Sequence, residues 1–302
     1  MNTSLPTQMS NSSTLARELA KIANSQVPDL ARAGLLIARL ECPQLDPKPY
    51  LAHLDRMGIQ ARLRLASAGD KTMRAQFELF TQYLFLDEGF TGKRENYEDP
   101  RNSYLNHVLD RRMGIPVALA IVFLAVAQRA GVQAAGINFP GHFLVRMQAK
   151  PSGRDRLPLV IDPFDRGRVL DEGDCRELLR QHVGDEAEFD LRLLEPSSPR
   201  QILVRVLGNL KRMYVRLRSF PRAHAVTDLL LAVNPQGVAD LRDRGLLAYH
   251  LRDFSGALRD LETYLHITAR TENGDASADR QAEHEQIWEH IKTLRRQVAN
   301  LN

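Results

Sequence analysis

The sequence predicts an α+β protein in which one buried helix lies beside a few β-strands and an array of paired helices follows. Residues 117–127 are an apolar run without glycine or proline, which is typical of a helix buried on every side. Strand-forming residues occupy 143–145 and 159–161. A 34-residue repeat follows further along the chain, and this period is typical of tetratricopeptide helix pairs.

Length and composition limit the possibilities. The chain has 302 residues, more than the ~100–150 of one domain, so two domains are expected. A net charge of +4 is too small to indicate nucleic acid by itself. Cys42 and Cys175 are too few for a disulfide framework or a zinc site, and no apolar run reaches the ~20 residues that cross a bilayer. We therefore expect a cytoplasmic protein without membrane contact, metal or cofactor.

The N-terminal part is predicted to be helical. Residues 1–27 are expected to hold a flexible leader, 1–13, and the start of the first helix. Apolar residues at three- and four-residue spacing predict helices near 15–22, 30–40, 50–63 and 77–85. We expect these helices to pack on the core without chemistry of their own.

A polar segment precedes the buried helix. Glu98-Asp99-Pro100 predicts a turn, and Asn102 or Ser103 is predicted to cap the helix that runs to Arg112. The polar side chains of this segment form either an internal hydrogen-bond network or a ligand-binding surface. They are Asp99, Arg101, Asn102, Ser103, Tyr104 and Asn106.

One histidine and one aspartate lie at the ends of the two predicted strands. His142 follows the turn Pro140-Gly141, and Asp162 ends the second strand. At neighbouring strand ends the two side chains can form a hydrogen bond that fixes the imidazole tautomer. The pair is therefore either a structural contact or part of a cleft.

These segments together resemble the transglutaminase-like core of the SirB/YchA-type bacterial family, whose members carry C-terminal tetratricopeptide helices. The resemblance implies a core at residues 28–195, with a small antiparallel sheet against the buried helix. Weaker similarity covers 28–90 and the helical tail. The segments that match are residues 97–106, 108–112, 114–116, 140–144 and 162–164.

The chain departs from the pattern of active transglutaminase-like enzymes. Those enzymes carry Gly-x-Cys at the start of the central helix, where this chain has Gly114-Ile115-Pro116. Proline suits a first helical turn but cannot attack a carbonyl. The resemblance therefore implies a scaffold retained for binding, as in eukaryotic F-box adaptors that carry the same module. The expected cleft residues are Asn102, Ser103, Tyr104, Asn106, Pro116, His142 and Asp162.

An enzyme remains the alternative. His142 and Asp162 would then activate an unconventional nucleophile for acyl transfer or amide hydrolysis. Cys175 lies near a predicted helix start, which favours the thiolate, but neighbouring acidic residues disfavour it. His284 and His290 are six residues apart, so they do not form a His-Glu-x-x-His zinc site.

Residues 195–199 are a predicted linker, and 196–302 are expected to form the tetratricopeptide-like domain, supported by a final helix at 280–301. Arg205, Arg212 and Arg216 lie opposite the apolar face of its first helix. They form either a solvated surface or a docking patch for an acidic protein partner; nucleic acid would require more basic and aromatic residues. The residues paired by the repeat are Leu207 with Leu241, Met213 with Leu247, Leu217 with Leu251, Phe220 with Phe254, Ala223 with Ala257, and Leu231 with Leu265.

Overall fold

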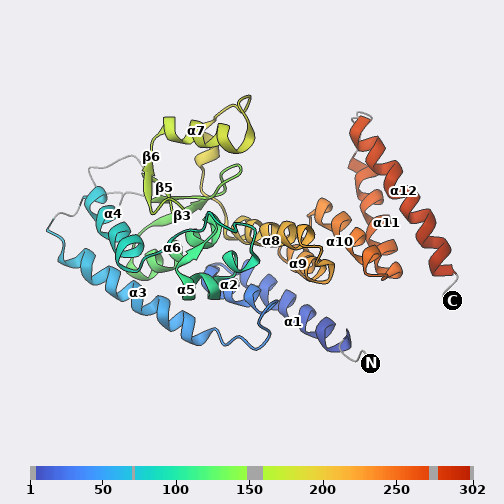
Figure 1. Cartoon of the computed structure of the whole chain (residues 1–302), viewed down its shortest axis with the longest axis horizontal. Coiled ribbons are helices and arrows are strands. Elements are labelled where there is room, and N and C mark those ends of the chain that lie inside the picture. The colour runs from blue at the N-terminus through green and yellow to red at the C-terminus, as the bar shows by residue number, and fades with distance from the viewer. Residues whose placement is uncertain (1–4, 70–71, 148–158, 272–277, 300–302) are drawn as a thin grey trace. The chain divides into compact units, whose positions relative to one another are not determined.

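The computed structural model describes residues 5–69, 72–147, 159–271 and 278–299. The predicted α+β class is confirmed, because these residues are mainly helical and form two small sheets (Figure 1). The chain divides into two compact units, Lys21–Val206, and Met1–Ala20 together with Leu207–Asn302. The division falls inside helix α8 (Pro199–Arg216), whereas we expected it in the linker at 195–199.

The first helices begin where the sequence supplies caps. Asp29 and Thr72 cap α2 and α4 by accepting backbone N–H groups three residues later. Residues 5–13, expected in a flexible leader, are helical instead, and Pro6 lies in the first turn, where its missing N–H has no intrahelical partner to lose. The helices are α1 (Leu5–Ala23), α2 (Leu30–Ala38), α3 (Lys48–Ser67) and α4 (Met73–Thr81), which continues as a π-helix, η1 (Gln82–Asp87).

Helix α6 (Pro116–Ala130) is the centre of the core, and the predicted burial of residues 117–127 is confirmed on nearly every side. It contacts α3, α5 (Leu105–Arg111) and the strands β3 and β4 (Figure 1). The main sheet is antiparallel with its strands in chain order, as the resemblance implied. Its strands are β3 (Ala134–Ile137), β4 (Leu144–Met147), β5 (Leu159–Asp162) and β6 (Arg168–Leu170).

A second, parallel sheet connects the loop before α6 to the core. It pairs β1 (Thr91–Gly92) with β2 (Met113–Gly114). Between them, the side chain of Asp99 caps a 3-10 turn, η2 (Pro100–Asn102). The prediction that Asn102 or Ser103 caps α5 is wrong, because Tyr104 is the N-cap residue and the Asn102 side chain is bonded elsewhere.

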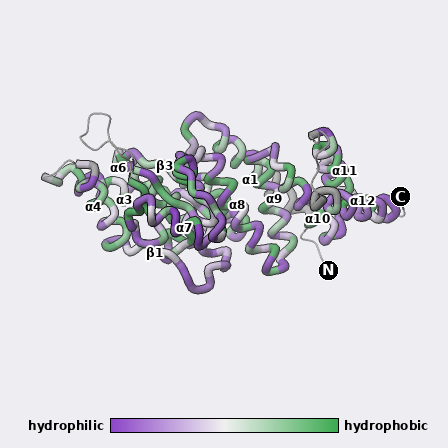
Figure 2. Tube along the Cα trace, turned by 90° about the horizontal axis from the view of Figure 1, so that it is seen from above, coloured by the Kyte–Doolittle hydropathy of each residue, from purple (hydrophilic) through white to green (hydrophobic). Residues whose placement is uncertain are grey.

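After the sheet, α7 begins with a capping box between Asp171 and Asp174. The helices that follow have the predicted 34-residue period, since Phe220 and Phe254 each begin the second helix of a pair. In Figure 2 these helices alternate between hydrophobic and hydrophilic residues, as expected when one face is buried. The helices are α7 (Glu172–Val183), α9 (Phe220–Val233), α10 (Val238–His250), α11 (Phe254–Thr271) and α12 (Ala278–Ala299), with a 3-10 turn, η3 (Leu191–Leu194), after α7.

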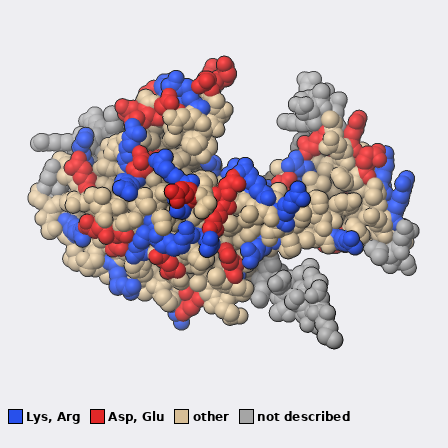
Figure 3. Space-filling view, viewed as in Figure 1, with Lys and Arg blue, Asp and Glu red and all other residues tan. Residues whose placement is uncertain are grey.

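Charged side chains of both signs alternate over the face seen in Figure 3. Among the described residues, no helix is long and apolar enough to cross a membrane.

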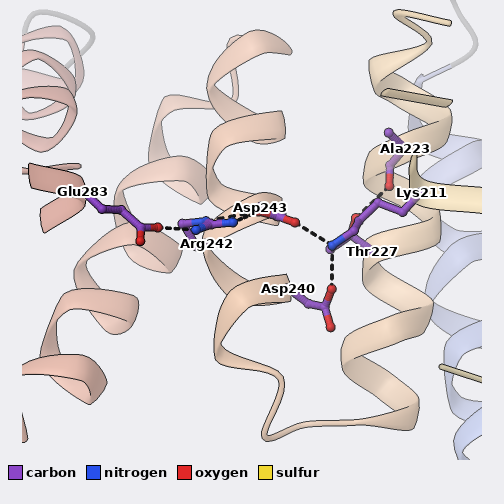
Figure 4. Close-up of polar contacts among 7 residues, drawn as sticks. All are labelled: Lys211, Ala223, Thr227, Asp240, Arg242, Asp243 and Glu283. Carbon is purple, nitrogen blue, oxygen red and sulfur yellow. Dashed lines mark hydrogen bonds and ion pairs between the residues drawn. The ribbon is translucent and has the colours of Figure 1, made fainter. Parts of the chain in front are cut away.

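Ion pairs link helices within the unit that contains residues 207–302, which we call the C-terminal unit. The Nζ atom of Lys211 lies 2.7 Å from a carboxylate oxygen of Asp240 and 2.5 Å from one of Asp243 (Figure 4). Arg242 bonds both Asp243 and Glu283, so the network joins α8, α10 and α12. The polar side of these helices is thus partly an internal surface.

Candidate functional site

His142 and Asp162 meet in the core of the unit formed by residues 21–206. His142 lies in the turn before β4, Asp162 ends β5, and these strands are antiparallel neighbours. The Nε2 atom of His142 lies 2.9 Å from Oδ1 of Asp162, and only 5% and 6% of the two residues are exposed. Since a carboxylate only accepts hydrogen bonds, Nε2 carries the proton and Nδ1 is the basic nitrogen.

The same carboxylate oxygen fixes the turn that follows β5. The backbone N–H of Phe164 donates to Oδ1 of Asp162 at 2.8 Å. The Phe164 ring lies edge-to-face with His142, with ring centroids 5.9 Å apart, and Tyr97 also lies edge-to-face with Phe164. A side chain at Gly92 would place its Cβ 2.4 Å from the Phe164 carbonyl oxygen, so this close approach requires glycine.

His182 covers the His142 ring, a contact that the sequence analysis missed. The two rings stack with centroids 5.3 Å apart and planes 19° apart. Gly141 has a φ of +70°, and a Cβ there would lie 2.3 Å from Cβ of His182, so only glycine allows α7 to approach this closely. Although His182 is exposed at the surface, partial desolvation of its ring lowers its pKa; His142 and Arg205 lower the pKa further, and Asp162 raises it in part. A neutral His182 therefore lies over the buried pair.

Arg205 has internal partners, although we expected it in an exposed docking patch. Its guanidinium donates to the backbone oxygen of His142 at 3.0 Å and to Oδ1 of Asn138 at 3.0 Å. Arg205 therefore holds the loop that carries His142. It was expected to lie in the exposed docking patch with Arg212 and Arg216, and these internal contacts correct that expectation. Arg212 and Arg216 are exposed, and Arg212 also donates to Asn209.

Asn102 connects the polar loop to the start of α6. It is fully buried, its side-chain amide donates to the Asn96 oxygen at 2.8 Å, and its Oδ1 accepts from Arg111 at 3.2 Å. Its backbone oxygen accepts from the N–H of Ile115, the N-cap residue of α6. Asn102 thereby fixes both the loop before Tyr97 and the residue before Pro116.

The other predicted cleft residues of this segment are also buried. Ser103 and Tyr104 lie between η2 and α5, and Pro116 occupies the first helical position of α6. Asn106 is 4% exposed, and its Oδ1 atom has no hydrogen-bond partner among the described residues. Most of this segment therefore forms an internal network, with Asn106 as an exception.

Cys175 is a poor alternative nucleophile. Its side chain lies in an apolar cluster with Ile137, Phe139 and Leu144. Burial, and then the nearby Asp174, raise the pKa of its thiol to about 11, so the reactive thiolate is scarce at neutral pH. Among the described residues, no group of histidine, cysteine and acidic side chains is arranged to hold a metal ion.

Comparisons with known proteins agree with this architecture. Residues 48–208 match a family model described as the transglutaminase-like superfamily, and residues 210–287 match a tetratricopeptide repeat model. A UPF0162 protein of Xylella fastidiosa is 40% identical over 86% of this chain and 91% of its own length. Protein SirB1 of Salmonella typhimurium is 27% identical over 63% of this chain and 69% of its own. Human F-box only protein 21 is 29% identical over 76% of this chain but only 38% of its own length.

Proposed function

This chain belongs to the transglutaminase-like superfamily, and we propose that it is a non-catalytic member, an adaptor or regulatory protein of the cytoplasm that holds a polypeptide partner. The observation that carries the proposal is Pro116 at the first position of α6, where the enzymes of the family have cysteine. A proline side chain has neither a nucleophilic atom nor a proton to give up.

The surroundings of His142 support a structural role for the pair. Its backbone N–H donates to Phe139, its carbonyl accepts from Arg205, and its Nε2 bonds Asp162. His182 stacks on its ring. A residue held in this way through its backbone, its Nε2 atom and its ring face can contribute to the architecture of the fold without any reaction.

Two further observations favour a protein partner. Tetratricopeptide repeats generally mediate protein interactions, and residues 210–287 match that family. In human F-box only protein 21 the similar region is one part of a longer chain, as expected of a module that serves a larger protein.

The mixed charges on the face seen in Figure 3 differ from the basic stripe of a nucleic-acid-binding surface.

The second candidate function is acyl transfer or amide hydrolysis with a His142/Asp162 dyad. It is favoured by one observation, the 2.9 Å hydrogen bond that leaves Nδ1 as the basic nitrogen. The test is incorporation of a labelled amine into a glutamine-containing peptide, and release of ammonia, by the purified protein and by His142→Ala. We expect no turnover above background in either sample. Turnover that disappears in His142→Ala would refute the non-catalytic assignment.

Binding is tested by affinity capture from the extract of the source cells. The bait is the full chain, and two charge reversals at the exposed arginines, Arg212→Glu and Arg216→Glu, report on the predicted docking patch. Arg62→Glu, on an exposed position of α3, is the matched control for the change in charge. We expect the full chain and the control to capture at least one polypeptide in common. Arg212→Glu and Arg216→Glu should capture less of it. Absence of any enriched polypeptide would contradict the adaptor proposal.

A further inference from the structure

The two helix pairs of the C-terminal unit turn in the same way. Leu217-Arg218-Ser219 joins α8 to α9, and Leu251-Arg252-Asp253 joins α10 to α11 at the equivalent repeat position. We call these two segments together the double turn.

Both arginines have the left-handed backbone that glycine prefers. The φ angles are 53° at Arg218 and 62° at Arg252. The backbone hydrogen bonds also match, since Arg218 donates to Val215 and Arg252 donates to Tyr249, each at 3.0 Å. These bonds use only main-chain atoms, so glycine would satisfy the turn with less strain. Arginine rather than glycine nevertheless occupies the equivalent position of both repeats.

The side chains of the double turn point to solvent. Among the described residues, neither Arg218 nor Arg252 has an ion pair, a side-chain hydrogen bond or a ring contact in the structure. Leu217 is 59% exposed and Leu251 is 37% exposed. Each repeat therefore presents one apolar and one unpaired cationic side chain.

The two turns lie next to each other. Phe220 directly follows the first turn and His250 directly precedes the second, and their rings stack with centroids 4.6 Å apart and planes 13° apart. This stack brings the two turns close together. The carboxylate of Asp253 accepts the N–H of Gly256 at 2.9 Å, so it is directed toward its own helix.

We propose that the double turn is a docking surface for an acidic, amphipathic polypeptide segment. Carboxylates would pair with Arg218 and Arg252, and apolar side chains would cover Leu217 and Leu251. Residues 200–222 contain no acidic side chain that could compete for Arg218. A nucleic acid would pair with the arginines but would leave the leucines exposed, so a polypeptide fits better. The inference rests on the proposed function and names the chemistry of the partner.

The test uses the full chain and a fluorescein-labelled peptide of about twelve residues with a Glu-Glu-Leu repeat. The probes for comparison are a Lys-Lys-Leu peptide and a single-stranded oligodeoxythymidine. Binding is measured by fluorescence anisotropy for the wild type, R218G/R252G, the charge-preserving R218K/R252K, and Arg62→Ala as a remote control. Because glycine suits a positive φ, the thermal midpoint of R218G/R252G should equal or exceed that of the wild type.

We expect R218G/R252G to weaken binding of the acidic peptide about tenfold, while R218K/R252K and Arg62→Ala keep most of it. Failure of the wild type to bind the acidic peptide, or equal binding by R218G/R252G, would overturn the inference. Stronger binding of oligodeoxythymidine than of the acidic peptide would also overturn it. If a polypeptide captured from extract stays on R218G/R252G, the inference fails but the adaptor proposal stands, whereas an empty capture on wild type rejects the adaptor proposal itself.

Discussion

Replacing Asp162 by alanine should reveal how much the buried pair contributes to the fold. One oxygen, Oδ1, accepts from both Nε2 of His142 and the backbone N–H of Phe164. Alanine removes both bonds and leaves two buried donors without partners. An orphaned buried donor costs about 1–3 kcal/mol, so we expect Asp162→Ala to lower the free energy of unfolding by about 3 kcal/mol.

The substitution Asp162→Asn separates the hydrogen bonds from the charge. An amide oxygen in place of Oδ1 can accept from both donors, so this variant should lose only the charge-assisted part, about 1 kcal/mol.

The assay is urea denaturation followed by far-ultraviolet circular dichroism, together with hydrogen exchange of the Phe164 amide. Exchange at Phe164 should accelerate strongly in Asp162→Ala and only slightly in Asp162→Asn. The reasoning is refuted if alanine costs less than about 1 kcal/mol, or if asparagine is as damaging as alanine.

Three further predictions concern α6, the ion pairs and pH. In Pro116→Cys, the new thiol at the helix N-terminus should react with iodoacetamide faster than Cys175, whose acidic neighbours disfavour the thiolate, and His142→Ala in that background should slow it; a rate unaffected by His142 would contradict a shared site. Asp260→Ala removes the buried partner of Arg244, whose nitrogens lie 2.6 and 2.9 Å from the Asp260 carboxylate, and should cost about 3 kcal/mol in urea denaturation followed by the fluorescence of the single tryptophan; a loss under about 1 kcal/mol would refute this. The pKa of His182 lies below its ordinary 6.5 in the folded state, so the unfolded chain binds this proton more readily. The protein should therefore have its full stability above pH 6.5 and lose stability as the pH drops from there toward the lowered pKa. His182→Gln should remove this loss of stability at acid pH, measured as the thermal midpoint at a series of pH values. An unchanged slope of the midpoint against pH would contradict this role of His182.

Local patterns in the sequence were enough to predict the main elements. Residues 117–127 have no polar side chain, so burial on every side was the simplest solution for α6. The 34-residue period placed both helix pairs, because each repeat buries the same small residue, Ala223 or Ala257, where its helices cross. The resemblance to the SirB/YchA-type family supplied the antiparallel sheet.

Contacts between distant segments could not be predicted in the same way. His182 lies 40 residues from His142 in the chain, and nothing in its local sequence indicates that α7 places it on that ring. Asn102 resembled a cap because asparagine is common at helix starts, but burial directed its amide to Asn96 and Arg111. Arg205 looked solvent-facing by helical periodicity, which carries no information about the loop that contacts it.

The ring stack between Phe220 and His250 determines how affinity can build up at the double turn. Because the stack holds the turns side by side, a ligand anchored at one of them finds the other within reach and loses little additional translational freedom. The affinities of the two weak contacts then reinforce each other, and the dissociation constant depends steeply on whether the ligand spans both turns. Substituting either ring would uncouple the two contacts while leaving each leucine and arginine in place.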